Sequence, residues 1–273
     1  MLPFNSKKIL SQFLAEDIGK GDITSTLLPK RKITARIISR EKAVVAGTKY
    51  AKEIFSINGC RVKILRKDGS EVKPNQTIMN ITGDARKILT CERTALNLLT
   101  RMTGIATQTK ELVKKIPNKK TKLYATRKTA PGLRIFDKEA VEIGGGKKHR
   151  LRLDEMVMIK DNHIAVSDSL LSLIKQAKKK YRKFEVEVEN SQDAVLAAKE
   201  GATIIMLDNF SPNQIKKTIQ ILKNKKLRDK VKLEASGGIT ARNIANYAVT
   251  GVDIISVGSI TNSVKGIDMS LEI

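Results

Sequence analysis

The chain has 273 residues, of which 41% are hydrophobic and 29% are charged, a composition that excludes a largely disordered protein. Its longest apolar runs, such as residues 204–207 and 252–257, are far shorter than the roughly 20 residues of a transmembrane helix, and its first residues lack the apolar core of a signal peptide. Two cysteines, Cys60 and Cys91, form neither a disulfide framework nor a metal-ligand spacing, so we expect a soluble, cytoplasmic protein without membrane partners.

The net charge of +24, from 52 basic and 28 acidic residues, has two interpretations. A basic surface can bind nucleic acid by exchanging counterions with phosphates, or the chain can be an enzyme of polyanionic substrates whose lysines mainly solvate its surface. Lysine blocks at residues 119–120, 178–180 and 225–226 lie at the ends of helix-like segments, where they complement the helix dipole. Because only 4% of residues are aromatic and Trp is absent, base-stacking platforms are scarce, and we expect no specific nucleic-acid partner.

In chain order, the first predicted element is a helix over residues 6–16. Short β-rich segments follow from 33 to 88, separated by turn signals such as Asp68-Gly69 and Gly83-Asp84, and they predict a small sheet domain. Residues 91–116 show helical spacing, predicting one long helix that ends at Pro117 and is either continuous or interrupted at Gly104. We therefore expect an N-terminal α+β sandwich domain over 1–105 and a second domain over 106–273, whose last ten or so residues can return to the first.

Beyond Pro117, strand and helix patterns alternate, which predicts a parallel sheet with right-handed crossovers, either doubly wound or closed into a barrel. Polar groups follow nearly every strand, and they converge on one mouth only if the sheet curls round, so barrel closure is favoured. The predicted fold is α/β, with a C-terminal parallel α/β barrel that is incomplete at six or seven strands. The six clearest strands lie within residues 122–126, 155–161, 184–190, 203–209, 231–238 and 253–259.

Residues 124–163 gather cationic and imidazole groups around three consecutive glycines, Gly144 to Gly146. Such a density predicts a site for a small, multiply anionic ligand, with the glycines as a bend. Lys160 follows an apolar run, where a buried cation would be costly without an anionic partner. His163 is either a structural hydrogen bonder at a strand end or a base. The groups in question are Arg127, Lys128, His149, Arg150, Lys160 and His163.

Later strands carry carboxylates and glycines. Glu185, Glu187 and Glu189 share one face of a strand, where they require partners such as lumen cations; internal salt bridges alone are the alternative. Glu189 and Asp208, at strand ends, can bind a divalent cation or ribose hydroxyls. The glycine-containing turns at Ser236–Gly238 and Gly258 follow adjacent strands and can present backbone N–H groups to a phosphate.

Eight motifs, in collinear order over nearly the whole chain, resemble the quinolinate phosphoribosyltransferase family. Together they are far more specific than any one of them. They are EDIGKGDITS at 16–25, ERTALN at 92–97, TRKT-PGLR at 126–134, GGG-HR at 144–150, IKDNH at 159–163, EVEVEN at 185–190, MLDN at 206–209 and EASGG at 234–238.

The resemblance implies transfer of a phosphoribosyl group from phosphoribosyl pyrophosphate to quinolinate with Mg²⁺, giving nicotinate mononucleotide, CO₂ and pyrophosphate. It also implies a homo-oligomer, a dimer or a hexamer, in which Arg93 enters the neighbouring subunit's site. Lys128, Glu189 and Asp208 match the catalytic positions, which bind the phosphoribosyl moiety and, through the two carboxylates, its metal. The positions that match quinolinate binders are Arg93, Arg127, His149, Arg150 and Lys160, and those that match the phosphate site are Ser236, Gly237, Gly238 and Gly258.

One position departs from the family's usual pattern, since Asn262 stands where a histidine is common. Asn262 can donate a hydrogen bond but cannot carry a charge, so we expect a retuned phosphate or loop contact. The alternative is a paralogue, because the fold is shared with nicotinate phosphoribosyltransferases and with a molybdate-operon protein. The retained cation set exceeds what a monocarboxylate such as nicotinate needs.

Overall fold

The structure is a computed structural model that describes residues 6–273, and the chain divides into two compact units. The first comprises the chain up to Lys110, together with Glu139–Gly144 and Val264–Ile273. The second comprises Glu111–Lys138 and Gly145–Ser263. The division falls a few residues beyond the 105/106 boundary expected from the sequence, inside the same long helix.

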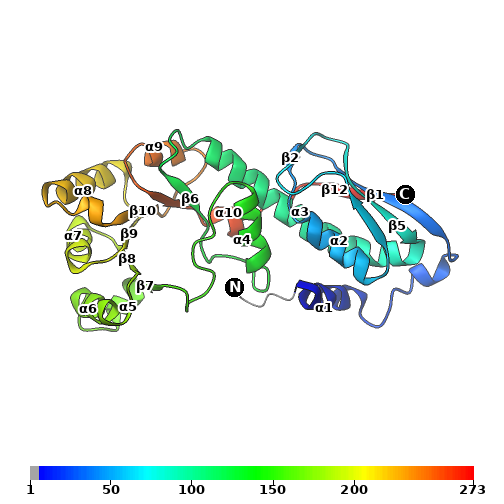
Figure 1. Ribbon diagram of the computed structural model, residues 1–273, viewed down its shortest axis with the longest axis horizontal. Coiled ribbons are helices and arrows are strands. Elements are labelled where there is room, and N and C mark those ends of the chain that lie inside the picture. The colour runs from blue at the N-terminus through cyan, green and yellow to red at the C-terminus, as the bar shows by residue number, and fades with distance from the viewer. Residues whose placement is uncertain (1–5) are drawn as a thin grey trace. The chain divides into compact units, whose positions relative to one another are not determined.

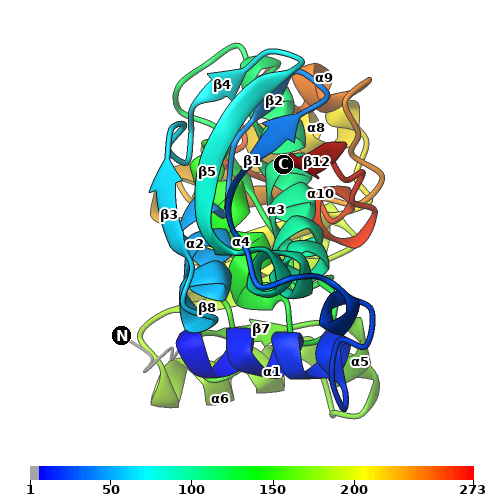
Figure 2. The same ribbon diagram turned by 90° about the vertical axis from the view of Figure 1, so that its right-hand side faces the viewer.

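The first unit is an antiparallel sheet accompanied by helices (Figure 2). Its strand order is β12-β1-β5-β3, so the chain's last strand pairs with β1 at one edge. Alternate residues of β1 are buried, and Ile37 and Ala35 belong to the core. The elements are α1 (Ser6–Ile18), a 3₁₀ turn at Ser25–Leu27, β1 (Lys32–Ser39), β3 (Arg61–Ile64), β5 (Gln76–Asp84), β12 (Met269–Glu272) and a separate pair, β2 (Ala43–Val44) with β4 (Glu71–Val72).

One helix of this unit, α2 (Thr48–Ile57), was absent from the sequence prediction, which assigned only strands to the region. The helix buries Tyr50, Ala51, Ile54 and Phe55, which recur at helical spacing. The amphipathic signal was therefore present, but the β-rich segments on either side outweighed it.

The long helix α3 (Ala85–Lys114) begins six residues before the predicted start at Cys91, and it runs through Gly104 without interruption. A Cβ at Gly104 would lie 2.1 Å from the carbonyl oxygen of Lys265. Glycine is therefore present because the returning C-terminal segment passes directly against the helix backbone, and it does not mark a break.

The second unit confirms the predicted parallel sheet. Its strand order is β6-β11-β10-β9-β8-β7, so from β7 to β11 each strand pairs with its neighbour in sequence, and the first strand, β6, pairs with the last, β11. That connectivity is the topology of a barrel with a seam between β6 and β7, and a parallel bridge from Tyr124 to Lys147 adds a short seventh segment. The strands are β6 (Lys122–Tyr124), β7 (Val157–Ile159), β8 (Phe184–Val188), β9 (Ile204–Asp208), β10 (Lys232–Ser236) and β11 (Ile254–Ser256).

Helices follow the strands, as βα alternation requires, and they surround the curved sheet in Figure 1. Side-chain caps fix several starts: Ser211 accepts a hydrogen bond from the Gln214 N–H, and Asn190 accepts one from the Asp193 N–H. The helices are α4 (Arg134–Ile143), α5 (Asp161–Ala165), α6 (Leu170–Lys180), α7 (Ser191–Glu200), α8 (Pro212–Asn224), a 3₁₀ turn at Arg228–Lys230, α9 (Ile244–Ala248) and α10 (Ser259–Asn262).

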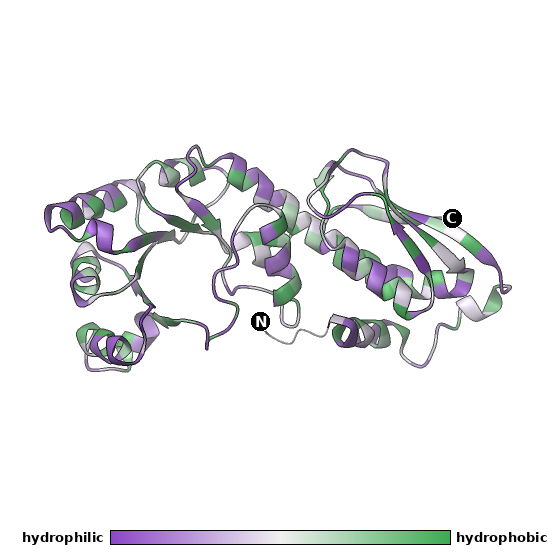
Figure 3. Cartoon of the chain, viewed as in Figure 1, coloured by the Kyte–Doolittle hydropathy of each residue, from purple (hydrophilic) through white to green (hydrophobic). Residues whose placement is uncertain are grey.

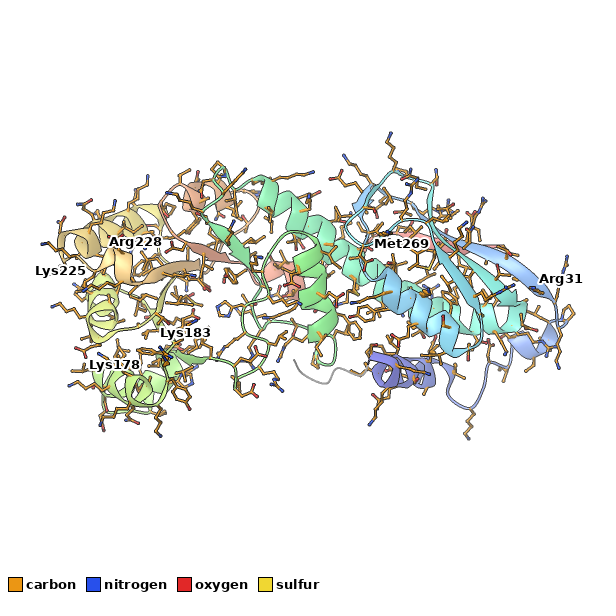
Figure 4. The ribbon with its side chains drawn as sticks, viewed as in Figure 1. Arg31, Lys178, Lys183, Lys225, Arg228 and Met269 are labelled. Carbon is orange, nitrogen blue, oxygen red and sulfur yellow. The ribbon has the colours of Figure 1, made fainter. Side chains whose placement is uncertain are left out.

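Hydrophobic residues make up much of the strands of the second unit, whereas hydrophilic and hydrophobic residues alternate along its helices (Figure 3). Lys178 of α6 and Lys225, just after α8, point outward at the ends of their helices (Figure 4). The lysine blocks therefore solvate the surface at helix ends, one of the two roles considered for the +24 charge. Within residues 6–273, no helix combines the length and the hydropathy that crossing a membrane requires.

Candidate active site

A cavity of about 360 Å³ opens at the carboxyl ends of the barrel strands, and all six strands or the residues directly after them contribute to its lining. This arrangement is the one expected if the sheet curls round, because only then do the strand ends share a mouth. The cavity brings together seven residues predicted from the sequence: Arg127, Lys128, His149, Arg150, Lys160, Asp208 and Ser236.

Two arginines at this cavity each keep one buried hydrogen-bond donor without an acceptor. The Nε atoms of Arg127 and Arg150 are both buried, and neither has a hydrogen-bond partner among the described residues. Arg150 uses its outer nitrogens to hold the loop, with Nη1 donating to the carbonyl oxygen of Met156 at 2.8 Å. Burial lowers the pKa of Arg150, and the nearby charge of Arg127 adds to this effect. Like charges with unused donors favour an anion at this position.

His149 connects this pair to buried carboxylates. Its Nδ1 accepts the backbone N–H of Arg150 at 2.8 Å, and its Nε2 lies 3.3 Å from an oxygen of Glu185 and 3.3 Å from one of Glu234. Neither of these last two contacts has hydrogen-bond geometry. Tyr124 packs edge-on against the ring, with centroids 5.6 Å apart. Both ring nitrogens therefore face groups of the protein, so His149 orders the neighbouring Arg150.

Two buried carboxylates, Glu185 and Glu234, lie on the Nε2 side of His149. Glu185 is fully buried and neither of its oxygens accepts a hydrogen bond among the described residues, whereas Glu234 accepts one from Ser256. Burial and the neighbouring Glu234 raise the pKa of Glu185 to about 7. Although burial opposes it, the two carboxylates raise the pKa of His149 to about 9. Since Nδ1 already accepts the Arg150 N–H, the neutral ring carries its proton on Nε2, the nitrogen that faces the two carboxylates.

The strand β8 places its three carboxylates in three environments. Glu185 is fully buried, Glu187 is largely buried beside Lys160, and Glu189 is exposed at the strand end. The Lys160 ammonium donates to the Glu187 carboxylate, so the predicted anionic partner of Lys160 is present within the protein. Asp208 lines the cavity, whereas Glu189 is not among the described residues that line it.

The two glycine turns differ in how closely their surroundings approach the glycine. A Cβ at Gly237, whose φ is +91°, would lie 2.1 Å from Oδ1 of Asn209 and 2.8 Å from its backbone nitrogen. A Cβ at Gly258 would lie 3.3 Å from the Lys128 side chain. Asn262, the position that departs from the family pattern, is 3.6 Å from that same point, so it lies beside Lys128 at this turn.

A second cavity, of about 280 Å³, lies at the amino-terminal ends of β9, β10 and β11, where Ile204, Lys232 and Ile254 line it. His149 and Arg150 line both cavities. These two residues therefore form a partition across the interior of the barrel, and the ordering of their loop closes the floor of the mouth.

The remaining predicted residues lie as follows. Arg93 is exposed on α3 in the first unit. His163 accepts the backbone N–H of Lys160 through Nδ1 at 2.9 Å, which is the structural alternative of the two predicted for it. Gly145, at φ +95°, is the bend, whereas Gly144 packs closely, since its Cβ would lie 2.5 Å from the Ala106 carbonyl oxygen.

Several residues of the site were not predicted as such: Glu187, Glu234, Ser256, Asn209 and Lys138. The strand alternation had marked Glu187 as a buried carboxylate in need of a cation, and that signal could have paired it with Lys160. Glu234 and Ser256 carry no local signal for their contact, because they lie on different strands. Asn209 is next to its partner Asp208 in the sequence, and Lys138 reaches carbonyls 10 and 12 residues away.

The fold and the cavity define a two-unit α/β-barrel protein whose mouth is lined by cationic side chains with unused donors. Comparison with known proteins places it among the phosphoribosyltransferases: residues 22–103 and 105–272 match the family models described as the N-terminal and C-terminal domains of quinolinate phosphoribosyl transferase. The chain belongs to the quinolinate phosphoribosyltransferase family.

Its relatives match along almost their full length. The chain is 44% identical to a probable nicotinate-nucleotide pyrophosphorylase (carboxylating) of Methanothermobacter thermautotrophicus, covering 97% of this chain and 98% of that protein. Among solved structures it resembles the nicotinate-nucleotide pyrophosphorylase of Francisella tularensis, with a TM-score of 0.91, 40% identity, and 98% and 95% of the two chains covered. The corresponding structure from Ehrlichia chaffeensis gives a TM-score of 0.93 at 36% identity, with 99% of each chain covered.

Proposed function

We propose that this protein transfers the phosphoribosyl group of phosphoribosyl pyrophosphate to quinolinate, releasing pyrophosphate and CO₂ and forming nicotinate mononucleotide for NAD biosynthesis. The observation that carries the proposal is the pair of buried Nε–H donors of Arg127 and Arg150, which have no protein acceptor in the cavity of a family member. Guanidinium groups bind planar carboxylates through paired, charge-assisted hydrogen bonds. Two such groups suit a ligand with two adjacent carboxylates.

The cavity supplies further charge at defined points. Lys160 is paired with Glu187, so its cation is oriented before any ligand arrives. The loop after β6 presents Lys128, whose carbonyl oxygen accepts a 2.8 Å hydrogen bond from the hydroxyl of Thr261 in α10. That bond fixes the exposed Lys128 beside the Gly258 turn, where it can bind the phosphoribosyl group or the departing pyrophosphate.

In the proposed reaction the pyridine nitrogen attacks C1 of the ribose, and the bond from C1 to the pyrophosphate oxygen breaks with its electron pair. Positive charge develops on the ribose in an oxocarbenium-like transition state, which a carboxylate such as Asp208 or Glu189 would stabilise. The bond to the 2-carboxylate then breaks, CO₂ leaves, and the electron pair on C2 takes up a proton. The quaternised nitrogen next to C2 stabilises that electron pair, so no covalent enzyme intermediate is required.

Asp208 fits the requirements of Mg²⁺, which usually takes one or two carboxylates and completes its shell with substrate phosphates and water. Its carboxylate lines the cavity and is oriented by a 2.7 Å hydrogen bond from the Asn209 side chain. Glu189 would add a ligand from the adjacent strand end. When bound, the ion would neutralise charge on the pyrophosphate as it leaves.

The assay measures nicotinate mononucleotide formed from phosphoribosyl pyrophosphate with either quinolinate or nicotinate, with and without Mg²⁺. Product from quinolinate alone, dependent on Mg²⁺, is the expected result; no product, or equal use of nicotinate, would refute the proposal. Replacing Arg150 with Met should lower kcat/KM for quinolinate by about 100-fold, since a hydrogen bond to a charged group contributes about 1.5–3 kcal/mol. Arg152→Met is the matched control, because this nearby arginine pairs with Asp154 on the surface.

The proposal includes a homo-oligomer, either a dimer or a hexamer, in which Arg93 of one subunit completes the neighbour's site, and a location in the cytoplasm. In support, Arg93 is an exposed arginine within a matched family motif. Inactive Arg93→Ala and Lys160→Ala variants, mixed under conditions of subunit exchange, should regain part of the activity. Absence of recovery despite verified exchange would argue against shared sites.

A further inference from the structure

Helix α4 carries a lysine into the interior of the protein. The side chain of Lys138 is fully buried, and Phe136, Ala140 and Val141 of the same helix are buried with it. Burial lowers the pKa of Lys138 to about 8, and the charge of Arg134 adds to this effect. An ammonium group in such surroundings is costly unless its donors are satisfied, so its partners indicate what it contributes.

The Lys138 ammonium donates to two backbone carbonyl oxygens of one loop. Nζ donates to the carbonyl of Lys148 and to that of Arg150, the latter at 2.6 Å. These two carbonyls lie on either side of His149. Among the described residues, Lys138 forms no ion pair, so the group acts as a hydrogen-bond donor to this loop.

The loop needs such support because its backbone is strained. His149 has φ +54°, a left-handed conformation that costs a non-glycine residue about 1–2 kcal/mol. The conformation lets the Arg150 N–H donate to Nδ1 of the same histidine, and it directs both side chains into the mouth cavity. Carbonyls that turn inward at such a loop require a buried donor, and Lys138 provides two hydrogen bonds from one atom.

We propose that Lys138 is a positioning residue for the dicarboxylate end of the substrate. By holding the carbonyls on both sides of His149, it keeps the Arg150 fork and the imidazole aimed into the cavity. This inference rests on the proposed function and goes beyond it, because Lys138 does not line the mouth and contacts no substrate. Its effect is expected in the binding of quinolinate, and not in the binding of phosphoribosyl pyrophosphate at the opposite glycine turns.

The test is Lys138→Met, which keeps the length of the side chain and removes its donors. We expect KM for quinolinate to rise at least tenfold, on the order of one lost buried hydrogen bond, while KM for phosphoribosyl pyrophosphate changes less than threefold. Lys138→Arg, which keeps donors at the end of a long side chain, should recover most of the quinolinate affinity. Lys147→Met, at an exposed position of the same loop, is the matched control and should match the unmodified protein.

The outcomes separate the two proposals. If the unmodified protein does not use quinolinate, the proposed function fails. If it does, and folded Lys138→Met shows an unchanged KM for quinolinate or an equal rise for both substrates, only the role of Lys138 fails. Should Lys138→Met not fold, Lys138→Gln, whose amide ends one atom short of the ammonium and so cannot hold both carbonyls, is measured by the same two KM values and judged by the same criteria.

Discussion

The Gly237 turn offers a test in which the neighbouring residue is the control. Gly237 and Gly238 both have positive φ, at +91° and +59°, but only Gly237 is crowded. A Cβ on Gly237 would lie 2.1 Å from Oδ1 and 2.8 Å from the backbone nitrogen of Asn209, whereas a Cβ on Gly238 has no atom within 4 Å. The two alanine variants therefore share the conformational cost and differ in the steric one.

The magnitude follows from these two contributions. Either alanine pays about 1–2 kcal/mol for a left-handed backbone. Gly237→Ala must in addition displace Asn209, whose N–H donates to the Ser236 carbonyl and whose side chain donates to Asp208, and such overpacking costs about 1–3 kcal/mol. We therefore expect the free energy of unfolding of Gly237→Ala to be lower than that of Gly238→Ala by the overpacking cost of about 1–3 kcal/mol.

The assays are urea unfolding and steady-state kinetics. Because the displaced Asn209 orients the Asp208 carboxylate, Gly237→Ala should also raise KM for phosphoribosyl pyrophosphate at least tenfold, a change of about 1.4 kcal/mol in binding, with a smaller effect in Gly238→Ala. Equal stability of the two variants, or an unchanged KM in Gly237→Ala, would refute the reasoning.

Three further predictions concern charge. The pKa of Glu185 is raised to about 7 from 4.5, so its contribution to stability is present below pH 4.5 and is lost as the pH rises through 7. In urea unfolding, the free energy of unfolding of Glu185→Gln should therefore increase relative to that of the unmodified protein, by up to about 3 kcal/mol over that pH range. Exposed Glu189→Gln is the control, and a difference that stays constant with pH would contradict the prediction. Lys160→Met leaves Glu187 without its cation and should lower the free energy of unfolding by about 1–3 kcal/mol. Adding Glu187→Gln should restore stability but not quinolinate affinity. Recovery of both would contradict a role of Lys160 in binding quinolinate. Chelation of divalent ions should abolish turnover while calorimetric binding of quinolinate alone persists; loss of that binding would place the metal at the dicarboxylate end.

The strands and most helices of the second unit were predictable because their signals are local. Each strand is a short apolar run ending in a polar group, and each helix has an amphipathic pattern or a cap within a few residues. The helix α2 was missed because strand-like segments surround it. The sequence alone could not show that α3 runs through Gly104 without interruption. Glycine is needed there because the Lys265 carbonyl, far away in sequence, lies against the helix.

By itself, the sequence determined the parallel α/β class, the family, and the residue types at the strand ends, because periodicity and collinear motifs are properties of neighbouring residues. Only the tertiary structure decided which groups neutralise one another. Lys160 meets Glu187, His149 meets Glu185 and Glu234, and Lys138 meets the carbonyls beside His149. These contacts join residues from different strands and loops. The donors that they leave without a partner, the Nε–H groups of Arg127 and Arg150, suit the cavity to the anionic ligand that we propose.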